Sequence, residues 1–138
     1  MFDNLSYENN YKPFAAYGQT KLANILMAME ISRRYQAVAL TSNAIQPGLV
    51  DTNLGRYMRG GTAAPTAKKV RPLRKGQKTA AQGASTQVYV AVDPRLDDVS
   101  GYFFGDCNPE VLKGDYARNT DLAANLWDVS EQLVGNYL

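Results

Sequence analysis

The chain has 138 residues, of which 45% are hydrophobic and 20% charged, and its net charge is only +2. This composition predicts a globular domain and excludes an intrinsically disordered chain. Because there is no histidine, triads and metal sites that need an imidazole are excluded, and we expect no metal site. The single cysteine excludes an internal disulfide and indicates a reducing compartment.

The N-terminus has neither the basic start nor the apolar stretch of a signal peptide. No apolar run approaches the ~20 residues of a membrane span. We therefore expect an intracellular protein, either cytoplasmic or membrane-associated. Residues 1–13 are polar and aromatic and are typical of a loop, with Pro13 close to a helix start. We interpret Ser6 as a loop serine.

The first predicted helix covers residues 14–35, where apolar side chains recur every three or four positions. Its apolar arc is broad, so we expect it to be covered on more than one side. Tyr17 and Lys21 are four residues apart, which places both side chains on one face. An ammonium beside a phenol favours the phenolate and permits proton exchange with a substrate hydroxyl. The spacing alone fits equally well an incidental pair on an exposed amphipathic helix.

A short strand is predicted over residues 38–45, with Val38 and Leu40 among its buried side chains. A helix followed closely by a buried strand indicates a parallel sheet of the βαβ type. The strand leads into a turn at residues 46–52, where Gly48 permits a sharp bend or a close approach by a ligand. Parallel sheets bind ligands just beyond the carboxyl ends of their strands, so this turn is a candidate ligand site.

Residues 53–78 are interpreted as a loop, because Gly60-Gly61 and Pro65 break any long element. From Arg56 to Lys78 there are eight Lys and Arg residues and no Asp or Glu. We favour a solvated basic loop that covers a pocket, and the alternative is a site for a phosphate or an acidic partner. Nucleic-acid binding is disfavoured, because the loop lacks interleaved aromatic residues and a recognised motif.

Three further elements complete the predicted order. A helix at residues 77–92 presents small side chains suited to lying on a sheet, a strand follows at residues 99–104, and a last helix covers residues 120–134. Cys107 has no basic or metal-ligating neighbour at a telling spacing, and we interpret it as structural. The small-residue face of the middle helix consists of Ala80, Ala81, Ala84, Val88 and Ala91.

Four segments in order resemble the carboxyl-terminal half of a short-chain dehydrogenase/reductase, in the retinol-dehydrogenase-like branch that includes the WW-domain oxidoreductase type. They are YGQTKLAN at 17–24, NAIQPGLVDT at 43–52, SGYF at 100–103 and LWDVS at 126–130. The resemblance implies an α/β fold, namely the C-terminal part of a Rossmann-like, doubly wound parallel sheet. Nothing in the chain matches the family's glycine-rich pyrophosphate turn or its dinucleotide-binding N-terminal half.

The resemblance also implies a chemistry. Tyr17 would be the general acid/base, and Lys21 would favour its phenolate and hydrogen-bond the nicotinamide ribose. The cofactor would be NADP or NAD, with NADP favoured, and the substrate an alcohol or carbonyl compound that is retinol-like, steroid-like or otherwise lipidic. Residues 53–78 would be the substrate lid. The cofactor-binding residues would be Tyr17, Lys21, Pro47, Gly48, Val50 and Thr52.

The family's active-site helix commonly packs against its copy in a second subunit, so the resemblance implies a homo-oligomer formed through the helix at 14–35. Because the glycine-rich turn has no counterpart and the catalytic serine would precede Met1, we expect the 138-residue chain to be inactive by itself. The alternative is a non-catalytic interaction or dimerisation module derived from such an enzyme. Membrane association stays open at this level.

Overall fold

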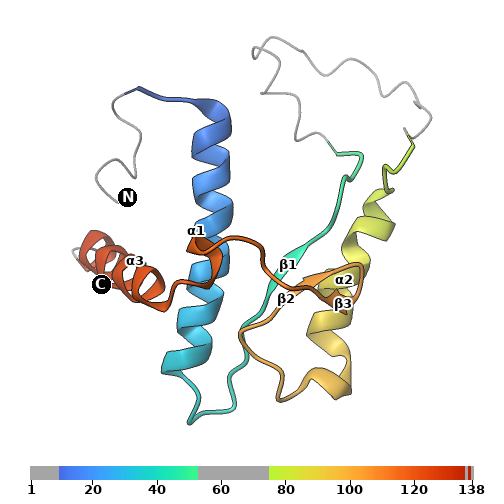
Figure 1. The fold of residues 1–138 in the computed structure, drawn as a ribbon. Coiled ribbons are helices and arrows are strands. Elements are labelled where there is room, and N and C mark those ends of the chain that lie inside the picture. The colour runs from blue at the N-terminus through green and yellow to red at the C-terminus, as the bar shows by residue number, and fades with distance from the viewer. Residues whose placement is uncertain (1–9, 53–74, 136, 138) are drawn as a thin grey trace.

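The computed structural model describes residues 10–52, 75–135 and 137. Figure 1 shows that the long first helix lies between the last helix on one side and a small sheet with the middle helix on the other. Two 3-10 turns, Pro94–Leu96 and Tyr116–Arg118, punctuate the connections. The elements in chain order are α1 (Pro13–Arg34), β1 (Ala44–Gln46), α2 (Ala80–Val92), β2 (Phe103–Gly105), β3 (Asn108–Pro109) and α3 (Thr120–Val134).

The described sheet has the order β1-β2-β3. β1 and β2 are parallel, with Ile45 opposite Phe104, whereas β2 and β3 form an antiparallel hairpin. The two loop residues of the hairpin, Asp106 and Cys107, have φ values of 50° and 59°, as a primed hairpin turn requires. The parallel pair confirms the predicted α/β class, and the hairpin was not foreseen.

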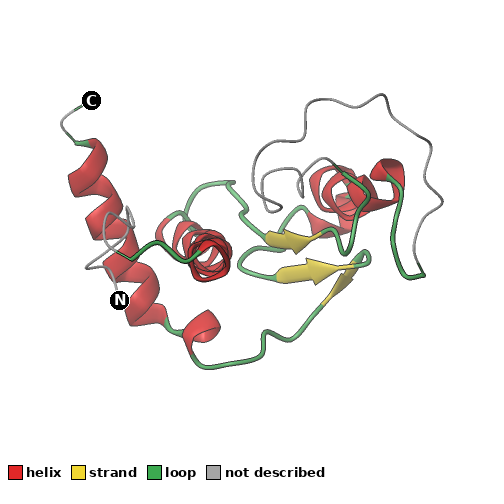
Figure 2. Ribbon diagram, turned by 90° about the horizontal axis from the view of Figure 1, so that it is seen from above, coloured by secondary structure: helices red, strands yellow, loops and turns green. Residues whose placement is uncertain are grey.

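The main apolar core lies between α1 and α3. Leu26, Ala123 and Leu126 are buried there, with Leu22 and Leu122 packed at the margin. Asn119 caps α3, because its side-chain oxygen accepts a hydrogen bond from the Leu122 amide at 2.8 Å. Seen from above, α3 and the sheet lie on opposite sides of α1 (Figure 2). The first helix is therefore covered on two sides, as the breadth of its apolar arc predicts.

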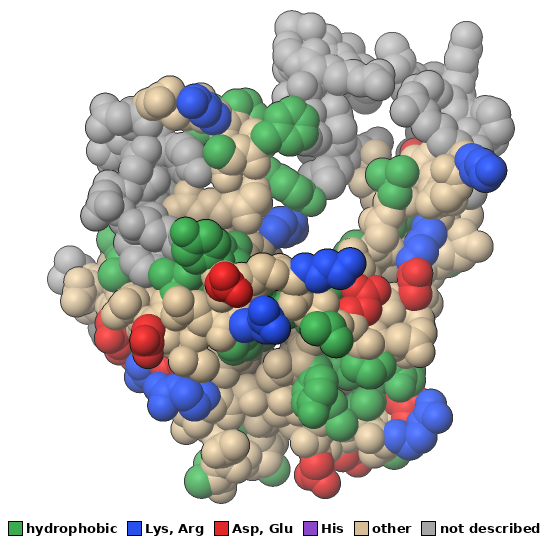
Figure 3. Space-filling view, viewed as in Figure 1, with side chains coloured by type: hydrophobic (Ala, Val, Ile, Leu, Met, Phe, Trp, Pro, Cys, Tyr) green, Lys and Arg blue, Asp and Glu red, His purple; other side chains and the backbone are tan. Residues whose placement is uncertain are grey.

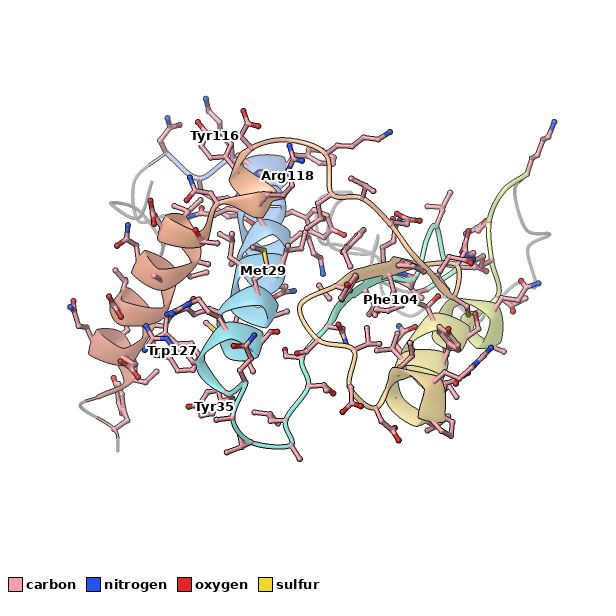
Figure 4. The ribbon with its side chains drawn as sticks, turned by 60° about the horizontal axis from the view of Figure 1, so that its bottom comes forward. Met29, Tyr35, Phe104, Tyr116, Arg118 and Trp127 are labelled. Carbon is pink, nitrogen blue, oxygen red and sulfur yellow. The ribbon has the colours of Figure 1, made fainter. Side chains whose placement is uncertain are left out.

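Charged and aromatic side chains fix the carboxyl end of α1. Glu30 is only 1% exposed and accepts hydrogen bonds from Arg33 and Arg34 at 2.6–2.9 Å. The Arg34 guanidinium lies 4.8 Å from the Trp127 ring centroid, and Tyr35 packs against the same indole at 6.2 Å (Figure 4). These contacts hold the end of α1 against α3.

A second, smaller core lies between α2 and the sheet. Phe104 is buried, and Tyr89 meets its ring at 6.3 Å in an edge-on geometry. The face of α2 that is buried carries Gly83 and Thr86. The predicted face was wrong, because Ala80, Ala81, Ala84, Val88 and Ala91 are all exposed. An alanine-rich helix has little amphipathic contrast, so its sequence does not determine which side is covered.

The strand predicted at residues 38–45 was too long and began too early. Residues 35–39 form a turn and β1 covers only Ala44–Gln46, and Val38 is 56% exposed rather than buried. Side chains replace a strand ladder just before β1. The side-chain NH2 of Asn43 donates to the Val99 carbonyl at 2.7 Å. The side-chain oxygen of Asn43 accepts from the backbone amide of Tyr102 at 2.9 Å. Strand pairing therefore begins only at Ala44.

The remaining boundaries agree more closely. The predicted helix at 14–35 is α1, shifted by one residue, and the helix at 120–134 is reproduced as α3. The helix predicted from residue 77 begins at Ala80, and the strand predicted at 99–104 is Phe103–Gly105. Predictions for residues 1–9, including Ser6, and for residues 53–74 of the basic loop lie outside the described residues. No helix in the described part has the length and apolar character that a membrane crossing requires.

Candidate functional site

Tyr17 and Lys21 lie on the face of α1 that is turned away from α3. Leu26, nine residues after Tyr17, is on the opposite side of the helix by helical geometry, and it is Leu26 that packs into the core with α3. Ala28 shares the side of Tyr17, because eleven residues make about three turns, and it is buried. The side chain of Tyr17 therefore points toward the sheet side of α1.

The two predicted catalytic side chains are in direct contact. The Lys21 ammonium lies 5.3 Å from the centroid of the Tyr17 ring, within the range of a cation–π interaction. Tyr17 is 43% exposed, so its hydroxyl remains accessible to a ligand. The Thr20 hydroxyl donates to the Tyr17 carbonyl at 2.8 Å. The structure thus brings the pair together on an accessible part of the helix.

The turn at residues 46–52 lies at the same end of the molecule. β1 runs opposite in direction to α1, so its carboxyl end leads toward the level of the amino-terminal half of α1 (Figure 1). Figure 3 shows the surface hollowed between the upper half of α1 and the residues that follow β1. Tyr17 and Lys21 belong to the amino-terminal half of α1, and residues 46–52 follow β1, so both segments lie at this end of the molecule.

The conformation of the turn explains its glycine. Gly48 has φ +79°, in the left-handed region that glycine adopts without strain. A Cβ at this position would also lie 2.9 Å from the Lys78 ammonium nitrogen. Val50 is half-buried and packs on Gly83 so closely that a Cβ there would lie 2.5 Å from a Val50 methyl. Thr52 is exposed at the end of the turn.

Lys78 anchors the turn through its backbone as well as its side chain. Its amide donates to the Leu49 carbonyl at 2.8 Å, and its carbonyl accepts from the Asp51 amide at 2.9 Å. These two bonds make a parallel bridge between Val50 and Lys78. The side chain donates to the Pro47 carbonyl at 3.0 Å. The chain just before α2 is therefore an additional strand-like support for the turn.

Sequence reasoning missed Lys78, Gly83 and Asp106. Lys78 was counted as one more cation of a basic loop, yet it directly precedes the capping box of α2, in which Thr79 and Gln82 exchange hydrogen bonds. The sequence signal for Lys78 was its position directly before the Thr79–Gln82 capping pair, which places it at the start of α2. Asp106 gave no signal, because the hairpin that presents it was not predicted.

Cys107, interpreted from the sequence as structural, lies in the β2–β3 hairpin turn beside α2. Its amide donates to the Thr86 hydroxyl at 3.2 Å, and Thr86 is buried in α2. Within residues 10–52, 75–135 and 137, no group of three or more His, Cys, Asp or Glu side chains is placed to hold a metal ion.

No model of a known protein family matches the chain. Curated sequences do. Retinol dehydrogenase 14 from Homo sapiens is 39% identical over an alignment of 139 positions. The alignment covers 97% of this chain and 39% of that protein. Short-chain dehydrogenase TIC 32 A from Brassica napus is 41% identical over 136 residues, or 97% of this chain and 41% of that protein.

The human WW domain-containing oxidoreductase is 34% identical over 128 residues, which span 92% of this chain and 30% of that protein. The chain thus spans roughly two fifths or less of the length of these relatives. The matches run through both the Tyr17 helix and the turn after β1, since they cover nearly all of the chain. On this similarity the chain belongs to the short-chain dehydrogenase/reductase family, in its retinol-dehydrogenase-like branch.

Proposed function

We propose that the chain carries the proton-transfer pair and the nicotinamide-binding turn of an NAD(P)-dependent oxidoreductase. One observation supports this above the others. Tyr17 and Lys21 are in contact in the amino-terminal half of α1, and β1 runs toward the level of that half before it leads into the turn at residues 46–52 (Figure 1). A proton donor and a dinucleotide site must be close together for hydride and proton to move in one reaction.

In the proposed reaction, a bound NAD(P) supplies or accepts the hydride. The Tyr17 hydroxyl exchanges a proton with the substrate oxygen: it accepts the proton of an alcohol as the carbonyl forms and donates one when a carbonyl is reduced. The Lys21 ammonium, which lies over the Tyr17 ring, donates a hydrogen bond to the ribose of the cofactor. The exposure of Tyr17 gives a substrate access to its hydroxyl.

The turn contributes backbone rather than charge. Pro47, Gly48 and Val50 would present main-chain groups to the nicotinamide, since the Lys78 side chain fills the space beside Gly48 and the Val50 side chain packs on Gly83. Thr52 offers a hydroxyl to the carboxamide or to a phosphate. We assign NADP as the preferred cofactor and a lipidic alcohol or carbonyl as the substrate class. Retinol appears in the names of relatives, and the substrate proposal extends that likeness to this chain.

A fluorescence titration tests the proposal. Purified chain is titrated into NADPH and, separately, NADH, with Lys21→Ala, Tyr17→Phe and the exposed Lys113→Ala as a matched control. We expect saturable binding that Lys21→Ala weakens by about tenfold, as loss of a charged hydrogen bond does. Lys113→Ala should leave the affinity nearly unchanged. A folded chain that binds neither dinucleotide would contradict the proposal, as would equal affinity for Lys21→Ala and the wild type.

A second candidate is a non-catalytic module that self-associates through α1. The first two turns of the helix favour it, because they project from the core: Phe14 is 76% exposed, and no described atom lies within 4 Å of a Cβ built on Gly18. Sedimentation equilibrium of the wild type and Phe14→Glu distinguishes the two candidates. A dimer that Phe14→Glu dissociates, together with no dinucleotide binding, would favour the module over the enzyme.

A further inference from the structure

Lys78 occupies a point where three separate segments meet. Its ammonium is paired with the Asp106 carboxylate and donates to the Pro47 carbonyl at 3.0 Å. Gln46 and Gly105, the last residues of β1 and β2, are register partners in the parallel pair. The lysine thus joins the segments that leave both strands at the edge where parallel sheets bind ligands.

The same residue also controls the backbone on both sides of Val50. The Lys78 amide and carbonyl bond to Leu49 and Asp51, so main chain and side chain together fix the turn at three positions. Gly48 lies between these positions with φ +79°. A glycine has no side chain to restrict it and loses more conformational freedom than any other residue when ordered. Its conformation therefore depends on anchors from outside the turn.

Asp106 is itself held in place. It occupies the hairpin turn with φ 50°, and its carbonyl accepts from the Asn108 side chain at 2.7 Å. The next residue, Cys107, donates its amide to the buried Thr86 hydroxyl of α2. The carboxylate that faces Lys78 thus belongs to a loop tied to α2. The Lys78 side chain is 25% exposed and the Asp106 side chain 73% exposed, so solvent reaches the carboxylate and weakens the ion pair.

We propose that Lys78 and Asp106 are a positioning pair that holds the backbone of residues 47–51 in the shape that receives the nicotinamide. This inference rests on the proposed function, and it adds two residues that act through the turn rather than on the cofactor. Asp106 orients the Lys78 ammonium, and the ammonium fixes the Pro47 carbonyl beside Gly48. The turn is thereby preorganised before a ligand arrives, which lowers the entropy lost on binding.

Two measurements on the 138-residue chain test the pair. The first is hydrogen exchange of the Asp51 amide, which donates to the Lys78 carbonyl, measured without ligand in Lys78→Met, Lys78→Arg and Asp106→Asn. The second is the dissociation constant for NADPH of the same variants and of the double variant Lys78→Met/Asp106→Asn. Matched controls are Lys113→Met and Asp98→Asn, which change exposed side chains elsewhere.

We expect Lys78→Met to accelerate exchange in the turn and to raise the dissociation constant by about tenfold, as for the loss of a charged hydrogen bond. Asp106→Asn should raise it about threefold, because this carboxylate is largely exposed. The double variant should resemble Lys78→Met alone, since the two side chains act as a unit. Lys78→Arg should recover part of the affinity. The controls should behave as the wild type.

Unchanged exchange in Lys78→Met would overturn the inference. Faster exchange with unchanged NADPH affinity would also overturn it, because the pair would then be structural only. If the wild type binds no dinucleotide, the proposed function fails. The exchange measurement still decides whether the pair holds the turn, and acceleration in Lys78→Met but not in Lys113→Met supports it.

Discussion

Protonation of Glu30 should weaken the carboxyl end of α1 as the pH falls. The hydrogen bonds from Arg33, opposed by burial and reinforced by Arg34, lower the pKa of Glu30 from 4.5 to about 2 in the folded chain. In the unfolded chain the pKa of Glu30 is about 4.3. The contribution of the carboxylate is therefore fully present above about pH 4.5 and is lost as the pH falls toward about 2.

The size of this contribution follows from the two pKa values. Their difference corresponds to about 3 kcal/mol as an upper bound. Although Glu30 is buried, the Arg33 side chain is 57% exposed, and water around it screens the pair. Solvent screening reduces the expected contribution to about 1–2 kcal/mol. This amount is large for a chain with so small a core.

Urea denaturation at pH 7, 5, 4 and 3 measures the contribution, with the fluorescence of Trp127, the sole tryptophan, as the probe. The variant Glu30→Gln should be less stable than the wild type at pH 7, and the difference should shrink by about half or more at pH 3. Asp93, whose pKa Arg95 lowers to about 2, titrates equally in both proteins and cancels. The exposed Glu131→Gln is the control. A difference that stays constant from pH 7 to 3 would refute the reasoning.

Three further predictions concern packing and capping, each checked by urea denaturation at pH 7. Leu26→Ala should cost about 3 kcal/mol, because it removes a fully buried side chain between α1 and α3; a loss below ~1 kcal/mol would contradict that core. Gly83→Ala should cost about 1–3 kcal/mol through its clash with Val50, and adding Val50→Ala should recover part of this. Asn119→Ala should lower the free energy of unfolding by about 1 kcal/mol, because it removes the side-chain cap on the Leu122 amide. An unchanged urea midpoint would show that the cap does not stabilise α3.

The features that could be predicted from the sequence are those encoded locally. The apolar repeat around Leu22 and Leu26 determines α1, and Asn119 marks the start of α3 as a side-chain cap. The pairing of Tyr17 with Lys21 follows from helical spacing alone. The glycine in the turn after β1 was also informative, since its backbone conformation is one that few other residues adopt.

The features that could not be predicted depend on tertiary contacts. Val38 and Leu40 look like strand residues, but residues 35–39 form a turn and both side chains are exposed. The buried face of α2 is determined by the contacts of Gly83 with Val50 and of Tyr89 with Phe104, which are remote in sequence. The support that Lys78 gives to the turn is likewise invisible without the fold, because it joins residues 31 apart.

The most direct test of the proposed site maps the amides that respond to a dinucleotide. Two-dimensional NMR of the 15N-labelled chain is recorded during a titration with NADPH. Saturable chemical-shift changes are expected in two groups, at residues 17–21 of α1 and at Gly48–Asp51 of the turn, while Leu126 and the rest of α3 should stay unchanged. Shift changes centred on α3, or none at all in a folded chain, would contradict the claim that these two segments form one cofactor site.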